Sequence, residues 1–472
     1  MGEAMKELID VLQQIPLFGN SETALARAVL CAMREVYEDV VASQGHVWIY
    51  KLGAWHKLEV GHVRSAIQVL DGRTFEVGMN KDGTPKVKGV DIQSSKVRGI
   101  YESLLWLHDL CDEQFFDNPA PGVAFEDGFI ALRDGQLRKE PHSPDHRCTF
   151  YVDAPIPSEE KPEAFLKFLG ELFQPDEDKE EKIDMLAEFL GACLTRTAHR
   201  HSAVVYLVGR GGNGKSVLLS CIKEMFEEDA VAHSSPARWH EPYNLAMLQN
   251  KSINICSELP ESETTAAADL FKSVVSGDPC QARLPYQPPF TFRPTAGHIF
   301  AGNTLPSPTS GDVSYGFFRR WLLISMNRTF TQEIVQRDPR EIVEKVAVER
   351  PQVIFWALQG AARLAQRGRY AVSEGAERMR TEWRTDSDAV ADFVASCCEI
   401  REDPSEWELL SDAYDNFRQF CGATGRKSGM GIRTFKKRLI QIDIQEAKRG
   451  GQVKVGLWVK AKMNWADAPV IH

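Results

Sequence analysis

The sequence contains no apolar run long enough to cross a membrane, no CxxC pair among its ten cysteines and no internal repeat. A membrane-spanning helix needs roughly 18 consecutive apolar residues, and zinc ribbons and dithiol sites need closely paired cysteines, so the sequence predicts none of these. The first residues include neither a basic n-region nor an apolar h-region, so we expect no secretory signal. We therefore expect a cytoplasmic protein with reduced thiols.

The composition is that of an ordinary globular protein, with 43% apolar and 26% charged residues in a chain of 472. At roughly 150 residues per domain, this length suggests about three domains. The formal net charge of −10 argues against a surface coated all over in nucleic acid. However, residues 426–462 carry eleven Lys and Arg against two acidic residues. A local basic surface therefore remains compatible with DNA binding.

One short apolar run, Ala203–Val208, is dense in β-branched residues and ends at a glycine. Such a run is typical of a strand buried on both faces of a parallel sheet. Apolar residues at helical spacing surround it, so the sequence predicts an α/β fold. The other elements expected are helices within 1–45, a hairpin within 46–58, a β-rich patch at 119–157, helices near 164–173 and 182–196, and helices after 335.

The expected strand runs into Gly209–Ser216, which has the pattern G-x-x-x-x-G-K-S and continues into an apolar helical segment. Glycines let successive backbone N–H groups converge on phosphate oxygens, and the helix N-terminus adds a positive dipole end. Lys215 is expected to contact the β- and γ-phosphates of ATP, and the Ser216 hydroxyl to bind Mg²⁺. The expected nucleotide-binding residues are Gly209, Arg210, Gly211, Gly212, Asn213, Gly214, Lys215, Ser216 and Val217.

Polar side chains follow two further expected strands. Glu258 stands where a hydrolase places a water-activating base or a metal partner, and an exposed carboxylate is the alternative. Asn303 stands where an amide could touch both the γ-phosphate and the attacking water, although asparagine is also common in turns. Arg319 and Arg320 precede a third apolar strand. One of them could reach the γ-phosphate of a neighbouring subunit, or they could form structural salt bridges.

Taken together, these motifs resemble the superfamily 3 helicases, and within them the branch of phage and plasmid primase-helicases with their poxvirus relatives. The motifs are GRGGNGKS at 209–216, Ser257-Glu258-Leu259, Ser276-Gly277-Asp278-Pro279 with Ala282-Arg283, Gly302–Pro306 and Phe318-Arg319-Arg320. The resemblance implies an AAA+-like motor that assembles as a hexameric ring and couples ATP hydrolysis to movement along single-stranded DNA. The roles it implies are Walker A for Lys215 and Ser216, Walker B acid and Mg²⁺ partner for Glu258, sensor for Asn303, and finger in trans for Arg319 or Arg320.

The resemblance also implies where DNA binds. Residues 279–294 fall where the family places its pore hairpin, and arginines near Tyr286, Phe290 and Phe292 suit a sequence-tolerant hold on single strands. An ordinary surface hairpin is the alternative. The basic tail resembles the family's winged-helix domain, with a solvated charged face as the alternative. The expected DNA contacts are Arg283, Arg293, Arg433, Lys436, Lys437, Arg438, Lys448 and Arg449.

The chain departs from the family in two places. Ser257 precedes the Walker acid where a second acid is usual, so Mg²⁺ is expected to rely more on Ser216, phosphate and water. Neither a paired-carboxylate motif nor a zinc-ligand cluster precedes the motor, so we expect no primer synthesis and a separate primase or origin-binding partner. The expected segments are a mixed helical and β-rich accessory region at 1–157, a helical segment at 158–200, a P-loop core at 201–335, a helical lid or linker at 336–388 and a winged-helix-like domain at 389–472.

The sequence as a whole predicts an ATP-dependent DNA helicase for the replication of a phage, plasmid or integrated element. Single-stranded DNA is expected in the ring channel and duplex at the C-terminal domain, with no membrane partner. Two alternatives stay open. One is an ATPase that remodels or packages nucleic acid without unwinding it, and the other is an origin-binding protein in which ATP only stabilises assembly.

Overall fold

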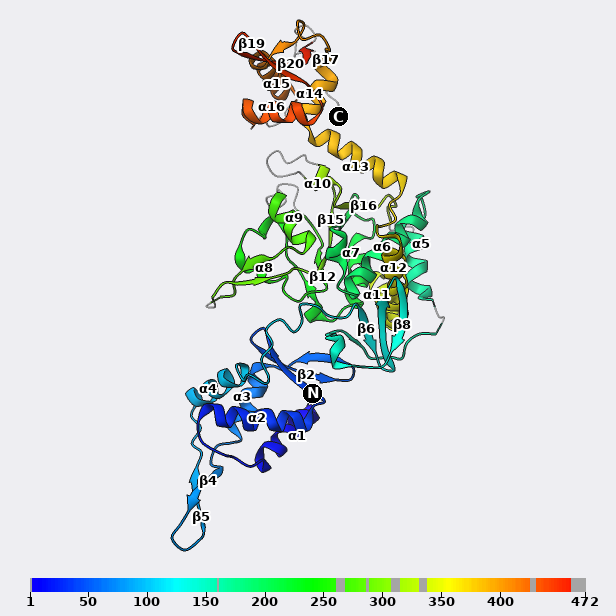
Figure 1. Cartoon of the computed structure of the whole chain (residues 1–472). Coiled ribbons are helices and arrows are strands. Elements are labelled where there is room, and N and C mark those ends of the chain that lie inside the picture. The colour runs from blue at the N-terminus through cyan, green and yellow to red at the C-terminus, as the bar shows by residue number, and fades with distance from the viewer. Residues whose placement is uncertain are drawn as a thin grey trace. The chain divides into compact units, whose positions relative to one another are not determined.

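The computed structural model describes residues 2–158, 161–259, 268–285, 288–306, 315–330, 338–424 and 430–459 (Figure 1). The chain divides into two compact units: residues 1–162, 190–197 and 349–368 form the first, and residues 163–189, 198–348 and 369–472 form the second. The segment expected as a lid or linker is therefore split, because 349–368 belongs to the first unit. Within the described ranges, no helix is long and apolar enough to cross a membrane.

Helices and a three-stranded antiparallel sheet form the N-terminal part of the first unit. The elements are α1 (Gly2–Gln14), α2 (Glu22–Val36), β1 (Asp39–Ser43), β2 (His46–Lys51), β3 (Ala54–Lys57), α3 (Val60–Gln68), β4 (Thr74–Met79), β5 (Pro85–Gly89) and α4 (Ser94–Leu105). Helix is predicted up to about residue 45, but the chain already enters β1 at Asp39. The β-branched Val40 and Val41 favour a strand, and Val41 pairs with Trp48 of β2.

A second sheet of the first unit, in the order β8-β7-β6-β9, accounts for the expected β-rich patch. The elements are β6 (Gly122–Phe125), β7 (Gly128–Arg133), β8 (Gln136–Glu140), a 3₁₀ turn (Pro144–His146) and β9 (Tyr151–Val152). Helix α12 (Arg350–Arg367) packs beside β8, where Nε2 of Gln366 donates to the carbonyl of Gly135 at 2.8 Å. The last turns of α6 (Lys179–Leu194) approach α12 closely, since a Cβ on Gly191 would lie 2.0 Å from the carbonyl oxygen of Ala357.

The second unit contains a five-stranded parallel sheet in the order β11-β12-β15-β10-β16. The strands are β10 (Val204–Val208), β11 (Val231–Ala232), β12 (Ile253–Cys256), β15 (Gly297–Gly302) and β16 (Trp321–Ser325). β10 pairs with both β15 and β16, so it lies inside the sheet, and its first four residues are buried. This confirms the predicted α/β class and the buried strand after residue 203.

Helices and one hairpin surround this sheet in the second unit. The elements are α5 (Glu163–Leu172), α7 (Lys215–Glu224), α8 (Pro242–Ala246), α9 (Ala268–Ser276), β13 (Cys280–Ala282), β14 (Phe290–Phe292), α10 (Tyr315–Phe318), α11 (Pro339–Val348) and α13 (Glu374–Ser387). Their aromatic core includes Phe271, whose ring stacks on Trp321 with centroids 5.1 Å apart. Trp383 of α13 packs edge-on against Phe318, the residue before the arginine pair, at 4.7 Å.

Residues 389–459 have a hydrophobic core of their own, centred on the buried rings of Phe393, Phe417 and Phe435. The elements are α14 (Ala389–Cys397), β17 (Cys398–Ile400), β18 (Glu408–Leu409), α15 (Leu410–Ala423), α16 (Ile432–Gln441), β19 (Glu446–Arg449), β20 (Gln452–Val455) and β21 (Leu457–Val459). The expected glycine-turned hairpin is β19–β20. Gly450 and Gly451 form its turn with φ of 58° and 83°, which glycine adopts at little cost.

Candidate nucleotide-binding site

The C-terminal ends of β10, β12 and β15 lie at one edge of the parallel sheet, and a cavity of about 400 Å³ opens there. Its lining residues are Gly211, Gly212, Asn213, Gly214, Lys215, Ser216, Val217, Ser257, Glu258, Gly302 and Asn303. The structure thus brings together the loop 209–217, Glu258 and Asn303, which are distant in the sequence. Gly209 and Arg210 begin the loop outside the lining.

The loop 209–217 needs glycine for its backbone and for its packing. Gly212 and Gly214 have φ of 77° and 83°, in the left-handed region, and Gly214 is the N-cap of α7. A Cβ on Gly209 would lie 2.2 Å from Nδ2 of Asn213 and 2.6 Å from the carbonyl oxygen of Met326. The loop therefore leads its backbone N–H groups to the start of a ten-residue helix, where an anion is stabilised by the helix dipole.

Lys215 is held at the cavity by oxygen atoms of its own loop. Its Nζ donates to the carbonyl of Gly209, to the carbonyl of Arg210 at 3.2 Å and to Oδ1 of Asn213 at 3.1 Å. Burial lowers the pKa of Lys215, and the carboxylate of Glu258 opposes this shift. This opposing effect indicates that the ammonium and the strand-end carboxylate share one electrostatic environment.

Glu258 and Asn303 both have exposed side chains at the cavity. The backbone N–H of Leu259 donates to the carbonyl of Ala301 at 2.9 Å, so the segment carrying Glu258 stays beside β15 after β12 has ended. On the other side, the hydroxyl of Tyr206 donates to the carbonyl of Thr304 at 2.6 Å and so fixes the turn that carries Asn303. These two hydrogen bonds thus hold the segments that carry the carboxylate and the amide at the same cavity.

Arg319 and Arg320 lie at the opposite edge of the sheet, and neither lines the cavity. They precede β16, which runs parallel to β10 with Trp321 opposite Val204. Five residues of strand, about 17 Å at 3.3 Å per residue, separate this edge from the loop.

The two arginines differ in their surroundings. Arg319 is exposed. Nη2 of Arg320 donates to Oγ of Ser276 at 3.0 Å, and its Nη1 donates to the carbonyl of Gly316. Burial lowers the pKa of Arg320, an effect that Arg319 strengthens and Asp278 opposes. Of the two, Arg320 therefore fits the structural alternative and Arg319 the role of an exposed finger.

A second cavity, of about 590 Å³, lies between α7 and α11 and shares Ser216 and Val217 with the first. Its walls combine apolar side chains such as Val343 with charged ones such as Lys223 and Arg340. Because the two cavities share a wall, they can hold adjoining parts of one ligand.

Residues 326–330, which follow β16, pack along the loop 209–217 and form a wall beside it. Nothing in the sequence indicates this contact. The N–H of Met326 donates to the carbonyl of Val208 at 2.8 Å, and the N–H of Phe330 donates to the carbonyl of Gly212 at 2.9 Å. The carbonyl of Met326 in turn accepts from Nδ2 of Asn213 at 3.1 Å. Residues 326 and 330 make these contacts through backbone atoms, which any residue supplies, so the identities of Met326 and Phe330 offer no signal for them.

A buried charged network fixes the end of β16, from which this wall begins. Nζ of Lys182 lies 2.9 Å from Oδ2 of Asp176 and 3.0 Å from Oδ1 of Asp178, and it donates to Oγ of Ser325 at 2.8 Å. The side chains of Lys182 and Asp176 are 3% and 6% exposed. A buried charge with partners of this kind holds a geometry firmly, because losing one partner leaves the other unpaired.

The predicted DNA hairpin is β13–β14, an antiparallel pair with Ala282 opposite Phe290. Arg283 and Arg293 are both exposed beside it, and Nη1 of Arg293 donates to the carbonyl of Gly277 at 3.4 Å. The aromatic part of the prediction is corrected: Phe292 is only 9% exposed and Phe290 packs against the same core. Tyr286 lies outside the described residues.

Within residues 430–459, not every cation of the basic tail is exposed as its sequence predicts. Arg433 and Lys437 on α16 and Lys448 on β19 are exposed. Nζ of Lys436 is paired with Oε2 of Glu446 at 2.7 Å. The side chain of Arg449 lies outside the part of the chain that the structure describes.

The prediction that Arg438 contacts DNA is wrong for this structure. Its side chain is 9% exposed and pairs with Asp388, the N-cap residue of α14, through Nε at 3.0 Å and through Nη2. The run of three cations at 436–438 passes through a helix, so one of them faces the core.

Comparisons with known proteins cover this region. The model of DUF5906, described as a family of unknown function, matches residues 207–320, which include the loop, Glu258, Asn303 and the arginine pair. No curated protein matches the chain. An A-form apo structure of the NrS-1 C-terminal region aligns with 13% identity and a TM-score of 0.45, covering 92% of this chain and 98% of that one. Two further apo structures of the region align at 12% and 13% identity, with TM-scores of 0.44 and 0.43, and cover 93% and 95% of this chain and 100% of theirs.

Proposed function

We propose that the chain is an ATP-dependent DNA helicase of the superfamily 3 type, working as a hexameric ring on single-stranded DNA in the replication of a phage, plasmid or integrated element. The observation that carries the proposal is the single cavity where the loop, Glu258 and Asn303 meet. A phosphate-binding loop, a strand-end carboxylate and an amide together can hold a triphosphate and orient a water molecule for attack.

The residues at this cavity fit ATP with Mg²⁺. Lys215 offers its ammonium to the β- and γ-phosphates, and the second cavity, beyond Val217, offers space for the nucleoside. Ser216 and Glu258 would hold Mg²⁺. This ion usually takes one or two protein oxygens and completes its shell with phosphate and water, so the missing second acid at Ser257 is tolerable. Bound Mg²⁺ would neutralise charge on the phosphates.

Each remaining polar group at the cavity has a role that its position supports. Glu258 is exposed to the cavity and accepts the proton of the attacking water, as a general base does. Asn303, on the neighbouring strand end, contacts the γ-phosphate through its amide. Oδ1 of Asn213 accepts a hydrogen bond from Nζ of Lys215 and so holds the lysine in place.

The position of Arg319 supports a ring. An exposed arginine about one strand length from its own cavity contributes to catalysis when a second subunit brings its cavity to that edge. The sheet order also fits the AAA+-like motor: numbered along the chain from β10, the strands run 5-1-4-3-2. Arg320 has a positioning role. Its hydrogen bond to Ser276, just before the hairpin β13–β14, holds the turn that carries Arg319.

Two basic elements support a DNA substrate. The hairpin β13–β14 carries exposed Arg283 and Arg293. Residues 389–459 have the order helix, two short strands, two helices, hairpin and final strand, which fits a winged-helix-like domain with exposed Arg433 and Lys437 on its third helix. Such cations position DNA by its phosphates and carry no sequence information.

The test is a forked-duplex displacement assay with ATP and Mg²⁺, run beside an ATPase assay on single-stranded DNA. We expect Lys215→Ala to lose both activities, and Glu258→Gln to lower hydrolysis by about 10²–10⁴-fold while ATP still binds. Glu228→Gln, an exposed glutamate in a 3₁₀ turn outside the cavity, is the matched control and should match the wild type.

The same assays separate the alternatives. Hydrolysis on single strands without displacement would favour an ATPase that remodels nucleic acid. DNA binding that depends on ATP but proceeds without hydrolysis would favour an origin-binding protein. Particles that remain monomeric with ATP and DNA would contradict the ring.

A further inference from the structure

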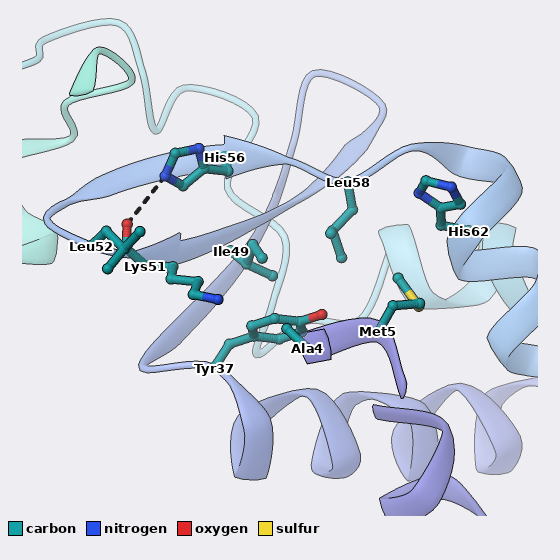
Figure 2. Close-up of a pocket in the computed structure, with 9 residues that line it drawn as sticks. All are labelled: Ala4, Met5, Tyr37, Ile49, Lys51, Leu52, His56, Leu58 and His62. Carbon is teal, nitrogen blue, oxygen red and sulfur yellow. Dashed lines mark hydrogen bonds between the residues drawn. The ribbon is translucent and has the colours of Figure 1, made fainter. Parts of the chain in front are cut away.

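A pocket in the first unit, separate from the nucleotide-binding cavity, has a volume of about 340 Å³ (Figure 2). Its wall comes from the start of α1, the residue after α2, the β2–β3 hairpin and the start of α3. Apolar Met5, Ile49 and Leu58 line it together with Tyr37 and Lys51. We propose that this pocket binds a small organic anion: a carboxylate or phosphate group carried on an apolar or aromatic body.

The floor of the pocket is preformed by the hydrophobic core. Ile49 and Leu58 are 3% and 1% exposed and belong to the core that the surrounding helices share. Figure 2 shows the ring of Tyr37 lying across the pocket beneath them. Because core side chains are fixed by close packing, an apolar body entering here meets a surface that needs no rearrangement.

Two polar groups can hold the anionic end of the ligand. The side chain of Lys51 is directed toward the Tyr37 ring in Figure 2, and within the described residues it forms no ion pair. The Tyr37 hydroxyl has no hydrogen-bond partner there either. Burial and the nearby carboxylate of Glu7 raise the pKa of Tyr37, so its hydroxyl keeps the proton that it can donate. An ammonium and a phenol can each donate to an oxygen of a carboxylate or phosphate.

His56, which also lines the pocket, does not supply the positive charge for the anion. Nε2 of His56 lies 3.1 Å from the carbonyl oxygen of Lys51, and since a carbonyl can only accept, the ring donates from Nε2. Burial lowers the pKa of His56, and the charge of Lys51 adds to the shift. His56 is therefore neutral at neutral pH and serves the hairpin backbone, which leaves the charge of Lys51 to the pocket.

The rim of the pocket carries a strained and exposed apolar residue. Leu52 has φ of 54° and Gly53 has φ of 82°, so the β2–β3 turn has two residues in the left-handed region. Such turns favour Asn-Gly, because a bulky side chain is strained there. Leu52 is nevertheless 54% exposed and lines the pocket. A leucine that is both strained and exposed is explained by contact with the apolar body of a ligand.

The experiment uses the full chain and the fluorescent probe 1-anilinonaphthalene-8-sulfonate, an aromatic body with one anionic group. We expect saturable binding of one probe molecule per chain, weakened about tenfold by Lys51→Ala, because a charge-assisted hydrogen bond is lost. Lys57→Ala changes an exposed lysine of β3 outside the pocket and should leave the affinity unchanged. Octanoate and phenyl phosphate, used as competitors, then show whether a carboxylate or a phosphate is preferred.

Leu52→Asn separates ligand binding from a structural role. It should weaken probe binding while raising the melting temperature by about 2–4 °C, because asparagine relieves the turn. A leucine without a role in ligand binding would show the rise in melting temperature alone. Equal probe affinity in the wild type, Lys51→Ala and Leu52→Asn would overturn the proposal, as would failure of both competitors to displace the probe.

Discussion

Oδ1 of Asn213 accepts a hydrogen bond from Nζ of Lys215 at 3.1 Å, while Nδ2 of the same side chain donates to the carbonyl of Met326, also at 3.1 Å. Asn213 is 4% exposed, although it occupies a position that the loop pattern leaves open to any residue. The buried amide thus connects the lysine of the loop to the chain after β16.

Replacing Asn213 with alanine should weaken ATP binding about tenfold, because Lys215 loses its side-chain anchor and the Met326 carbonyl loses its donor. An unsatisfied buried group of this kind costs roughly 1–3 kcal/mol, so the free energy of unfolding should fall as well. Calorimetry with a non-hydrolysable ATP analogue and urea unfolding measure the two effects. Asn213→Asp keeps the acceptor for Lys215 and loses the donor, so it should retain more of the affinity. Unchanged binding in Asn213→Ala would show that the anchor is unimportant.

With Arg319 as the proposed finger in trans, Arg319→Ala should lower ATP hydrolysis by about 10³–10⁵-fold, and it should change stability little because the side chain is exposed. Arg320→Ala should instead lower the melting temperature, because it removes the bond to Ser276. Arg320→Lys retains the charge without the planar fork and should recover only part of the stability.

Mixing inactive variants tests whether Arg319 acts between subunits. A ring of Arg319→Ala and Lys215→Ala chains contains some interfaces with an intact loop on one side and an intact Arg319 on the other. Hydrolysis should therefore reappear on mixing, in proportion to such interfaces. A mixture as inactive as its components would contradict a finger in trans.

Local patterns in the sequence predicted the parts of the fold that depend on local chemistry. Ala203–Val208 reads as a buried strand because apolar β-branched residues fit a two-faced sheet interior, and it is β10. The loop is recognisable because glycines and a lysine are required at fixed spacing. Strand-end positions placed Glu258 and Asn303 at one edge, since parallel strands share their polarity.

Long-range partners could not be predicted in the same way. Nothing in the spacing of Arg438 shows that Asp388, fifty residues earlier, neutralises it inside a core. Likewise, the wall formed by Met326 and Phe330 uses backbone groups that leave no residue signature. Charge runs predict a basic surface only as far as each side chain reaches solvent, and that depends on tertiary packing.

His298 should make the second unit sensitive to acid. Its Nδ1 accepts from Nδ2 of Asn254 at 3.3 Å, and its Nε2 is buried without a partner among the described residues. Burial lowers the pKa of His298 to about 3, whereas the unfolded chain binds the proton near pH 6.5. The contribution of neutral His298 to the free energy of unfolding is therefore complete above pH 6.5. Below pH 6.5 the free energy of unfolding falls by about 1.4 kcal/mol per pH unit, until pH 3.

Urea unfolding at pH 7.5 and pH 5.5 measures this effect, with His298→Asn as the comparison. The asparagine can still accept from Asn254 but does not titrate. The wild type should lose about 1.4 kcal/mol more than the variant between the two pH values. Burial also lowers the pKa values of His56 and His146. Both proteins contain these histidines, so their contributions cancel when the loss in the variant is subtracted from the loss in the wild type. Identical losses would show that His298 does not control the response.

The two arginines of α16 should separate folding from DNA binding in the C-terminal part. Arg438→Ala leaves Asp388 buried without its partner, so unfolding of residues 389–459 should become easier by about 3–5 kcal/mol. Arg433→Ala removes an exposed cation, so stability should hold while DNA affinity falls and the slope of its logarithm against log salt drops by about one. Circular dichroism melts and fluorescence anisotropy over a salt series measure these quantities. The opposite outcome is an equal change of the salt slope in Arg433→Ala and Arg438→Ala, with normal melting of both variants. Arg438 would then have to leave Asp388 to reach a phosphate. The buried pair would not describe the DNA-bound state.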